Sequence, residues 1–217
     1  MWNRIFDVDN AVFRAIDTIG KIFILNLYWV ICSLPIFTIG ASTSALLYAS
    51  MKLHDKEGYV TSNFFSSFKE NFKQATEIWL IYLVIGILLG FDFMMGNQAK
   101  DTLGVCMQGA AMILAIPYFL SLLYVFGVQS RFVNPVKDTI RYSFFMALRN
   151  MKCTIQMAIL MILLVWANTT VLLVNFLTLV YGFGLMGYFF AAYYKKAFGK
   201  YLNPEENSYN RCIRKIT

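Results

Sequence analysis

Long apolar runs separated by short polar stretches dominate the sequence. The clearest runs are Ile78–Met95, Leu103–Val128, Thr154–Val174 and Phe176–Tyr194. Each is long enough to cross the hydrocarbon core of a bilayer as a helix, which needs about 20 residues. The pattern therefore predicts four membrane-spanning helices between residues 78 and 194.

An earlier apolar region, Ile22–Leu53, is too long for one ordinary span and is interrupted by Pro35. Proline has no backbone N–H to donate, and it disfavours helix at the residue before it. We therefore predict two short helices, Lys21–Leu34 and Ile39–Leu53, joined by a tight turn. One long kinked helix is the alternative.

The composition places the chain in a membrane. Hydrophobic residues make up 59% of the 217 residues and charged residues only 14%. Ordinary soluble domains have about 45–50% and about 25% of these residues. A chain of this size cannot bury so much apolar surface in one water-facing core. The same figures exclude a disordered chain and a disulfide-rich secreted scaffold.

The distribution of basic residues discriminates between topologies. With six spans, 18 of the 19 basic residues fall on one side and only Lys100 lies on the other, whereas with five spans the division is 15 to 4. Because basic residues concentrate in cytoplasmic loops, the charges favour six spans arranged as three hairpins, with cytoplasmic N- and C-termini. Five spans are the alternative. A second alternative is that the first two helices, Lys21–Leu34 and Ile39–Leu53, form a re-entrant pair, because both are short for a full crossing.

We thus expect an all-α, polytopic membrane helix bundle that forms one integral membrane domain over residues 1–217. Residues 1–20 are expected to form an N-terminal cytoplasmic segment. Residues 201–217 are expected to form a polar, basic C-terminal tail.

Amphipathic, aromatic segments precede the second and third predicted hairpins. In residues 62–74, four phenylalanines share a helical face, and in residues 135–151 apolar side chains form a stripe at helical spacing. The stripe consists of Val136, Ile140, Phe144, Leu148 and Met151. Such helices with basic flanks are typical of a membrane interface, where they either anchor the protein or dock a partner. The candidate docking residues of the first segment are Phe64, Phe68, Lys69, Phe72 and Lys73.

The two segments also indicate an internal repeat. Asn71-Phe72-Lys73 aligns with Asn150-Met151-Lys152 at an offset of 79 residues. Residues 12–16 are a candidate for a shorter, degenerate third copy.

Small residues mark places where helices are expected to approach closely. Ala41, Ala45 and Ala49 recur every four residues, and Gly86 and Gly90 form a G-x-x-x-G motif. The predicted turn and packing residues are Pro35, Thr38, Gly40, Ala41, Ala45, Ala49, Gly86 and Gly90.

The search for chemistry yields no catalytic, cofactor or metal site. Gly182, Gly184 and Gly187 match G-x-G-x-x-G, but without the strand and acidic residue of a dinucleotide site, so we interpret them as packing residues. The four cysteines form no C-x-x-C pair, and the single histidine, His54, is expected to be solvated in a polar loop. We predict no enzyme, no cofactor and no nucleic-acid partner.

Polar groups inside the apolar runs allow one further site. Asp92 lies a few residues before a polar loop, so it either reaches interfacial water or lines a cavity. Asn26 and Ser42 are the other candidate cavity residues. Interhelical hydrogen bonds are the alternative for these uncharged side chains.

Three stretches carry a family resemblance: Asn26-Leu27-Tyr28-Trp29, the run from Ser33 to Thr43, and the run from Phe64 to Gln74. They resemble the YesL family of small bacterial membrane proteins. The resemblance implies a multi-pass protein of the bacterial cell membrane whose biochemical activity is unknown. Because genes of the family commonly lie beside those for carbohydrate ABC importers, it also implies a role in sugar uptake.

The leading hypothesis is an integral membrane accessory protein that acts with a carbohydrate ABC importer by docking. Its partners would be the lipid bilayer and subunits of that transporter, and its docking surfaces would be Phe64–Lys73 and Val136–Met151. The chain lacks the E-A-A motif of importer permeases. The alternative is a small autonomous transporter of a neutral polar solute.

Overall fold

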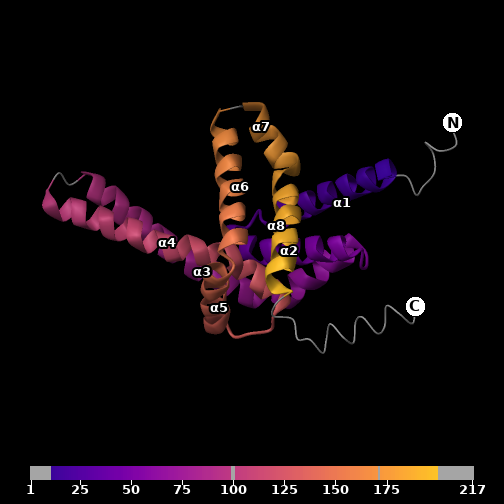
Figure 1. The fold of residues 1–217 in the computed structure, drawn as a ribbon, viewed down its shortest axis with the longest axis horizontal. Coiled ribbons are helices and arrows are strands. Elements are labelled where there is room, and N and C mark those ends of the chain that lie inside the picture. The colour runs from indigo at the N-terminus through magenta and orange to yellow at the C-terminus, as the bar shows by residue number, and fades with distance from the viewer. Residues whose placement is uncertain (1–10, 99–100, 171, 200–217) are drawn as a thin grey trace.

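The computed structural model describes residues 11–98, 101–170 and 172–199, which form helices joined by short turns (Figure 1). No strand occurs within these described ranges, so the all-α prediction is confirmed for them. In chain order, the elements are α1 (Ala11–Cys32), a 3-10 turn (Ile36–Thr38), α2 (Ile39–Asp55), α3 (Val60–Gln98), α4 (Thr102–Arg131), α5 (Val136–Arg149), α6 (Met151–Thr170), α7 (Leu172–Leu177), a π-helical turn (Thr178–Gly182) and α8 (Phe183–Phe198).

Five helical segments of the described chain are long and apolar enough to cross a membrane. They are Phe13–Cys32, Val60–Gln98, Thr102–Arg131, Met151–Thr170 and Val174–Phe198. This confirms a multi-pass membrane architecture, but not the six predicted spans, because α2 is not among the five. With 17 residues, α2 is about 26 Å long, and most of its side chains are buried by other helices.

The predicted break at Pro35 is present, so one long kinked helix is wrong. The hydroxyl of Thr38 lies 2.6 Å from the carbonyl oxygens of both Cys32 and Pro35, which share its one proton, and this contact connects the end of α1 to the turn. The indole N–H of Trp79 donates to the carbonyl of Ile36 at 2.8 Å. The helix before the turn is longer than predicted, because α1 begins at Ala11 and includes half of the expected N-terminal segment.

Helices α1 and α2 run antiparallel. Trp29, near the end of α1, donates its indole N–H to the Thr43 hydroxyl near the start of α2, at 3.1 Å. Leu25, one turn earlier in α1, packs in the same cluster as Ala49. The start of α1 and the end of α2 therefore lie at one end of this hairpin.

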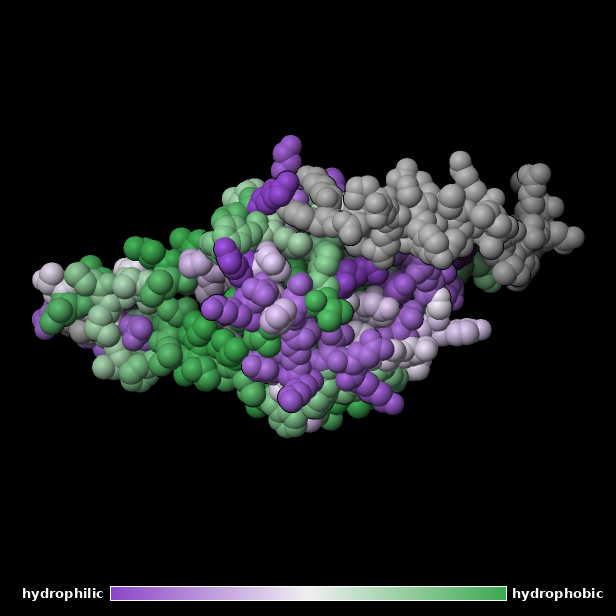
Figure 2. All heavy atoms as spheres, turned by 90° about the horizontal axis from the view of Figure 1, so that it is seen from below, coloured by the Kyte–Doolittle hydropathy of each residue, from purple (hydrophilic) through white to green (hydrophobic). Residues whose placement is uncertain are grey.

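Three apolar arms diverge from a shared core instead of forming one parallel bundle. In Figure 1 the α3–α4 hairpin extends to the left, the α6–α8 hairpin extends upward and α1 extends to the right. The core draws buried side chains from six of the helices, among them Leu47, Ile78, Tyr124, Ala147, Met157 and Tyr194. Seen from below, hydrophilic residues gather over the centre, whereas the α3–α4 hairpin is mainly hydrophobic (Figure 2).

The two amphipathic segments differ in their connection to the spans. Residues 62–74 are the first part of α3, which has 39 residues and a length of about 58 Å, nearly twice the thickness of a hydrocarbon core. Only the second segment forms a separate helix, α5, which is followed at Asn150 by α6. Two separate interfacial helices are therefore not present.

The face that α5 buries differs from the predicted stripe. Thr139, Ser143 and Ala147 are buried, whereas Leu148 and Met151 are exposed. Small side chains on α5 permit a close approach to α4. Phe145 and Leu148 lie on the outer surface, whereas Val136, Ile140 and Met146 are partly buried against the core.

Burial repeats at the predicted offset of 79 residues. Four pairs of equivalent positions in α3 and in α5–α6 are buried: Val60 and Thr139, Phe64 and Ser143, Ala75 and Thr154, and Ile78 and Met157. Asn71 and Asn150 each donate to the carbonyl four residues earlier, at 3.1 Å. The segment before α3 follows the same register, since Ser42 and Ser121 are both buried, as are Ala49 and Val128.

At an offset of 79 residues, α2 and α3 thus correspond to the second half of α4 followed by α5 and α6. This correspondence supports two copies of the repeat. Residues 13–16 of the expected third copy are exposed and do not share the pattern.

Candidate functional site

Asn26 is a fully buried polar side chain that joins α1 to the last helix. Its side-chain N–H donates to the carbonyl of Leu179 at 2.7 Å, and its side-chain oxygen accepts the backbone N–H of Gly184 at 2.9 Å. Leu179 and Gly184 are five residues apart, which is the spacing of a π-helical hydrogen bond. The amide of Asn26 therefore bridges two backbone groups at the π-helical turn.

Glycines allow the close approach that this bridge requires. A Cβ atom on Gly184 would lie 2.6 Å from the carbonyl oxygen of Ile22, and one on Gly187 would lie 2.8 Å from Cγ of Leu46. These contacts agree with the interpretation of the G-x-G-x-x-G residues as packing residues.

The three candidate cavity residues are not brought together. Ser42 is fully buried and donates to the carbonyl of Thr38 at 3.1 Å, within its own helical turn. Asp92 is exposed on the outer part of α3. With Asn26 at the α1–α8 contact, these side chains occupy three separate environments.

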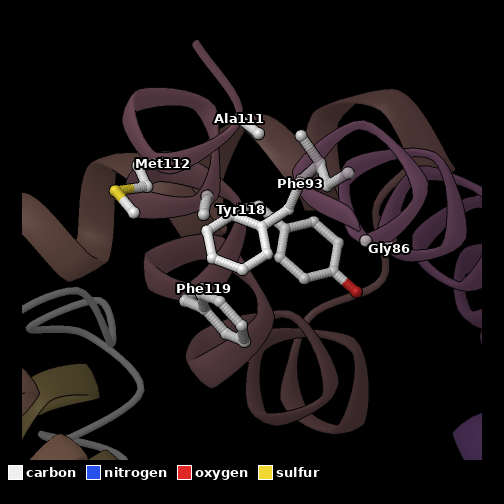
Figure 3. A pocket seen from close by; sticks show the side chains of 9 residues that line it. Gly86, Phe93, Ala111, Met112, Tyr118 and Phe119 are labelled. Carbon is white, nitrogen blue, oxygen red and sulfur yellow. The ribbon is translucent and has the colours of Figure 1, made fainter. Parts of the chain in front are cut away.

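An apolar groove of about 320 Å³ lies between α3 and α4 (Figure 3). Gly90, Phe93, Met112 and Phe119 are among the residues that line it. No other atom lies within 4 Å of a Cβ built on Gly90, so this half of the G-x-x-x-G motif makes no close helix contact.

Gly86 is the half of that motif that does make a close contact. A Cβ atom there would lie 2.6 Å from the hydroxyl oxygen of Tyr118. That hydroxyl donates to the backbone carbonyl of Tyr82 at 3.1 Å. The absent side chain at Gly86 thus lets a tyrosine of α4 reach the backbone of α3.

The residues after the proline turn lie at the tightest helix crossing. Ala41, Ala45 and Ala49 are fully buried. A Cβ atom on Gly40 would collide with the carbonyl oxygen of Ala75 and would lie 2.6 Å from Cβ of Trp79. At Gly40 the backbone of α2 therefore lies directly against α3.

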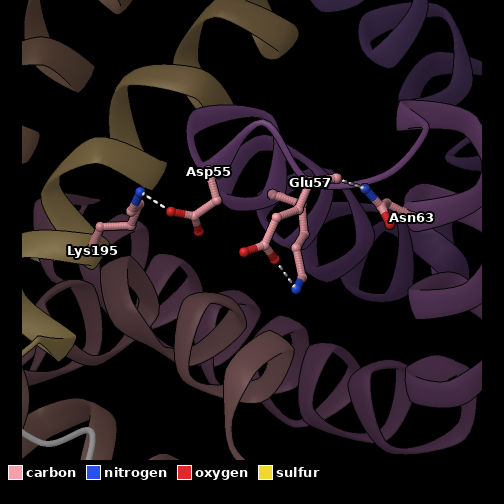
Figure 4. A network of polar contacts seen from close by, with 5 residues as sticks. Asp55, Glu57, Asn63 and Lys195 are labelled. Atoms are coloured by element: carbon pink, nitrogen blue, oxygen red, sulfur yellow. Dashed lines mark hydrogen bonds and ion pairs between the residues drawn. The ribbon is translucent and has the colours of Figure 1, made fainter. Parts of the chain in front are cut away.

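Ionic contacts connect the end of α2 to α8 and to the start of α3 (Figure 4). Lys195 of α8 forms an ion pair with Asp55, and Lys52 forms one with Glu57 at 2.7 Å. The side chain of Asn63 donates to the backbone carbonyl of Glu57 at 2.9 Å. Lys52 and Lys195 therefore have partners within the protein.

His54 is not the solvated loop residue that we expected. It lies in the last turn of α2, half-buried, and its ring stacks on Tyr188 at a centroid distance of 4.0 Å. Its Nε2 lies 2.9 Å from the carbonyl oxygen of Tyr188, and because a carbonyl only accepts, the proton of this bond is on Nε2.

The candidate docking residues separate into a buried part and an exposed part. Phe64 is fully buried, with its ring 5.6 Å from that of Tyr28, so it is not available to a partner. Phe68 is partly buried against the same cluster. Lys69, Phe72 and Lys73 are exposed.

One buried polar contact was not anticipated from the sequence. The side chain of Gln129 is buried in α4, and its N–H donates to the side-chain oxygen of Asn71 in α3 at 3.2 Å. The only signal was a polar residue within an apolar run. Among the described residues, no three His, Cys, Asp or Glu side chains are grouped so that they could hold a metal ion.

Comparison with known proteins gives one match. Residues 22–93 match the family described as "Protein of unknown function, DUF624". No curated protein matches the chain, and neither does any solved structure. The matched segment contains Asn26, the proline turn, Gly40 and the exposed Lys69 and Lys73. Over these residues the chain is therefore similar to a family of unknown function.

Proposed function

We propose that this protein is a non-catalytic accessory protein of the bacterial cell membrane that docks a cytoplasmic partner. The docking surface consists of Lys69, Phe72 and Lys73. The protein crosses the membrane six times, with the α1–α2 hairpin as the first pair and both termini in the cytoplasm.

The observation that carries this proposal is an exposed aromatic side chain between two lysines without ion-pair partners. Phe72 is exposed, and neither Lys69 nor Lys73 forms an ion pair within the described part of the chain. By contrast, Lys52 and Lys195 are paired internally. Exposed aromatic groups with basic neighbours are typical of protein interfaces, where complementary charge guides association.

The position of the docking surface in the fold supports a partner at the membrane boundary. Lys69 and Lys73 lie in α3 just before its apolar part, Ile78–Met95. The end of α2 lies beside the end of α8, because Asp55 pairs with Lys195. Because basic residues concentrate on the cytoplasmic side of membrane proteins, we assign these basic helix ends to the cytoplasm.

The proposed partner is a subunit of a carbohydrate ABC importer with an acidic cytoplasmic surface. Support for the importer comes from the resemblance of the chain to the YesL family. Support for an acidic surface comes from the two unpaired lysines. An autonomous transporter has less support, because Asn26 and Ser42 make their hydrogen bonds within the protein.

Purification from the native membrane in mild detergent tests the proposal. We expect wild-type protein to retain importer subunits and the variant Lys69→Glu/Lys73→Glu to lose them. The control variant Lys56→Glu/Lys196→Glu makes the same change of net charge at two other exposed lysines. Retention of importer subunits by the first variant, or equal loss from both, would contradict the proposed surface.

A further inference from the structure

Helix α5 connects two candidate spans and presents an unusual outer face. It lies between Arg131, the last residue of α4, and Met151, the first residue of α6. At 3.6 residues per turn, Lys137, Arg141, Phe145 and Leu148 occupy about a quarter of the helix circumference. All four are exposed, with 53% of Phe145 and 42% of Leu148 accessible.

On this face two basic side chains, Lys137 and Arg141, are followed by two large apolar ones, Phe145 and Leu148. The guanidinium group of Arg141 lies 5.8 Å from the ring centroid of Phe145. Neither Lys137 nor Arg141 forms an ion pair within the described residues. The one acidic residue of α5, Asp138, lies at the edge of this face, about 60° around the helix from Arg141 and about 20° from Phe145. The outer face therefore has a net positive charge in its first half and large apolar side chains in its second half, toward α6.

The apolar part of this face continues into a span. Met151, Ile155 and Ile159 are exposed along α6, which is one of the helices able to cross a membrane. As a membrane span, α6 would present these side chains to lipid, and its first residues, which directly follow α5, would lie near the headgroups.

We propose that the outer face of α5 binds the phosphate headgroups of anionic phospholipids in the adjacent leaflet. Lys137 and Arg141 supply the charge complementary to the headgroups, together with the exposed Lys152 at the start of α6. Phe145 and Leu148 insert between the headgroups, as on amphipathic helices that lie in a membrane interface. This site is distinct from the docking surface at Lys69, Phe72 and Lys73.

Each basic residue near an anionic surface strengthens binding by about fivefold. The test uses the full chain, purified with excess phosphatidylglycerol and phosphatidylcholine in equal amounts, and measures by mass spectrometry which lipid the protein retains. We expect wild-type protein to enrich phosphatidylglycerol. The variant Lys137→Gln/Arg141→Gln/Lys152→Gln should lose this enrichment, whereas Lys137→Arg/Arg141→Lys should keep it.

The control variant, Arg14→Gln/Lys56→Gln/Lys196→Gln, removes the same number of charges from exposed positions outside both surfaces. We expect it to retain the wild-type enrichment and both neutralised variants to unfold at the wild-type temperature in detergent. An equal loss of enrichment in the two neutralised variants would overturn the inference in favour of a diffuse effect of net charge. Unchanged enrichment in the α5 variant would overturn it as well.

Discussion

The side-chain oxygen of Asn26 accepts the backbone N–H of Gly184 at 2.9 Å, across 158 positions of the chain. The same amide donates to Leu179, on the other side of the π-helical turn. In a membrane environment, backbone groups without water must find a partner within the protein. Asn26 thus satisfies two groups of the last hairpin from the first helix, and it fixes how these two elements pack.

Replacement of Asn26 with leucine is expected to destabilise the protein. Leucine has a similar size but leaves the Leu179 carbonyl and the Gly184 N–H without their partner, at roughly 1–3 kcal/mol for each buried group. Thermal unfolding in detergent measures the effect. Asn63→Leu is the control, because Asn63 makes a single hydrogen bond at an exposed position. Equal unfolding temperatures for wild type and Asn26→Leu would contradict the bridging role.

Gly40→Ala and Gly20→Ala form a matched pair of substitutions in helices. Alanine is intrinsically better than glycine in a helix by about 1 kcal/mol, so Gly20→Ala should be neutral or stabilising, since its Cβ meets no other atom within 4 Å. Gly40→Ala should destabilise by about 1–3 kcal/mol, because its Cβ collides with the backbone of α3. Thermal unfolding of both variants checks the difference. A stabilised Gly40→Ala variant would show that α2 does not cross α3 at this point.

The two glycines of the G-x-x-x-G motif are expected to differ in the same assay. Gly86→Ala should displace the Tyr118 hydroxyl and break its hydrogen bond to Tyr82, at a cost of about 1 kcal/mol. Gly90→Ala should not destabilise the protein, because the added Cβ atom meets no other atom within 4 Å in the groove. Equal destabilisation by both substitutions would indicate that the motif packs as one unit.

Cysteine labelling is expected to distinguish six passes from five. In a background without the four native cysteines, Phe13→Cys and Tyr59→Cys should react with a membrane-impermeant maleimide only when the cytoplasmic side is accessible. Leu103→Cys, at an exposed position in the first turn of α4, should react from outside. If Phe13→Cys also reacts from outside, α1 crosses the membrane without a return by α2, and five passes are correct.

Much of the secondary structure was predictable because its signals are local. A proline in a long apolar run marks the break before α2, and the apolar runs locate the remaining spans. The start of α1 is harder to predict from the sequence. Arg14 and Asp17 indicate a polar segment, but in the structure the helix already includes them. Charges on the exposed side of a helix do not interrupt it.

Tertiary contacts were harder to predict, because periodicity identifies a face but not what covers it. Phe64 and Phe72 share a predicted face, yet α1 and α2 bury the first and leave the second exposed. The sequence gives no signal for the π-helical turn either. Asn26 was recognisable as a polar residue in an apolar helix, but its partners lie more than 150 positions away.

Site-specific photo-crosslinking at Phe72 tests the proposed docking most directly. The photoreactive amino acid p-benzoylphenylalanine replaces Phe72 in one variant and Phe64 in a second, and both are irradiated in native membranes. The account predicts that position 72 crosslinks to a subunit of a carbohydrate importer, whereas the buried position 64 crosslinks only within the chain. The absence of an intermolecular crosslink at position 72, with the protein folded and inserted, would contradict docking through this surface.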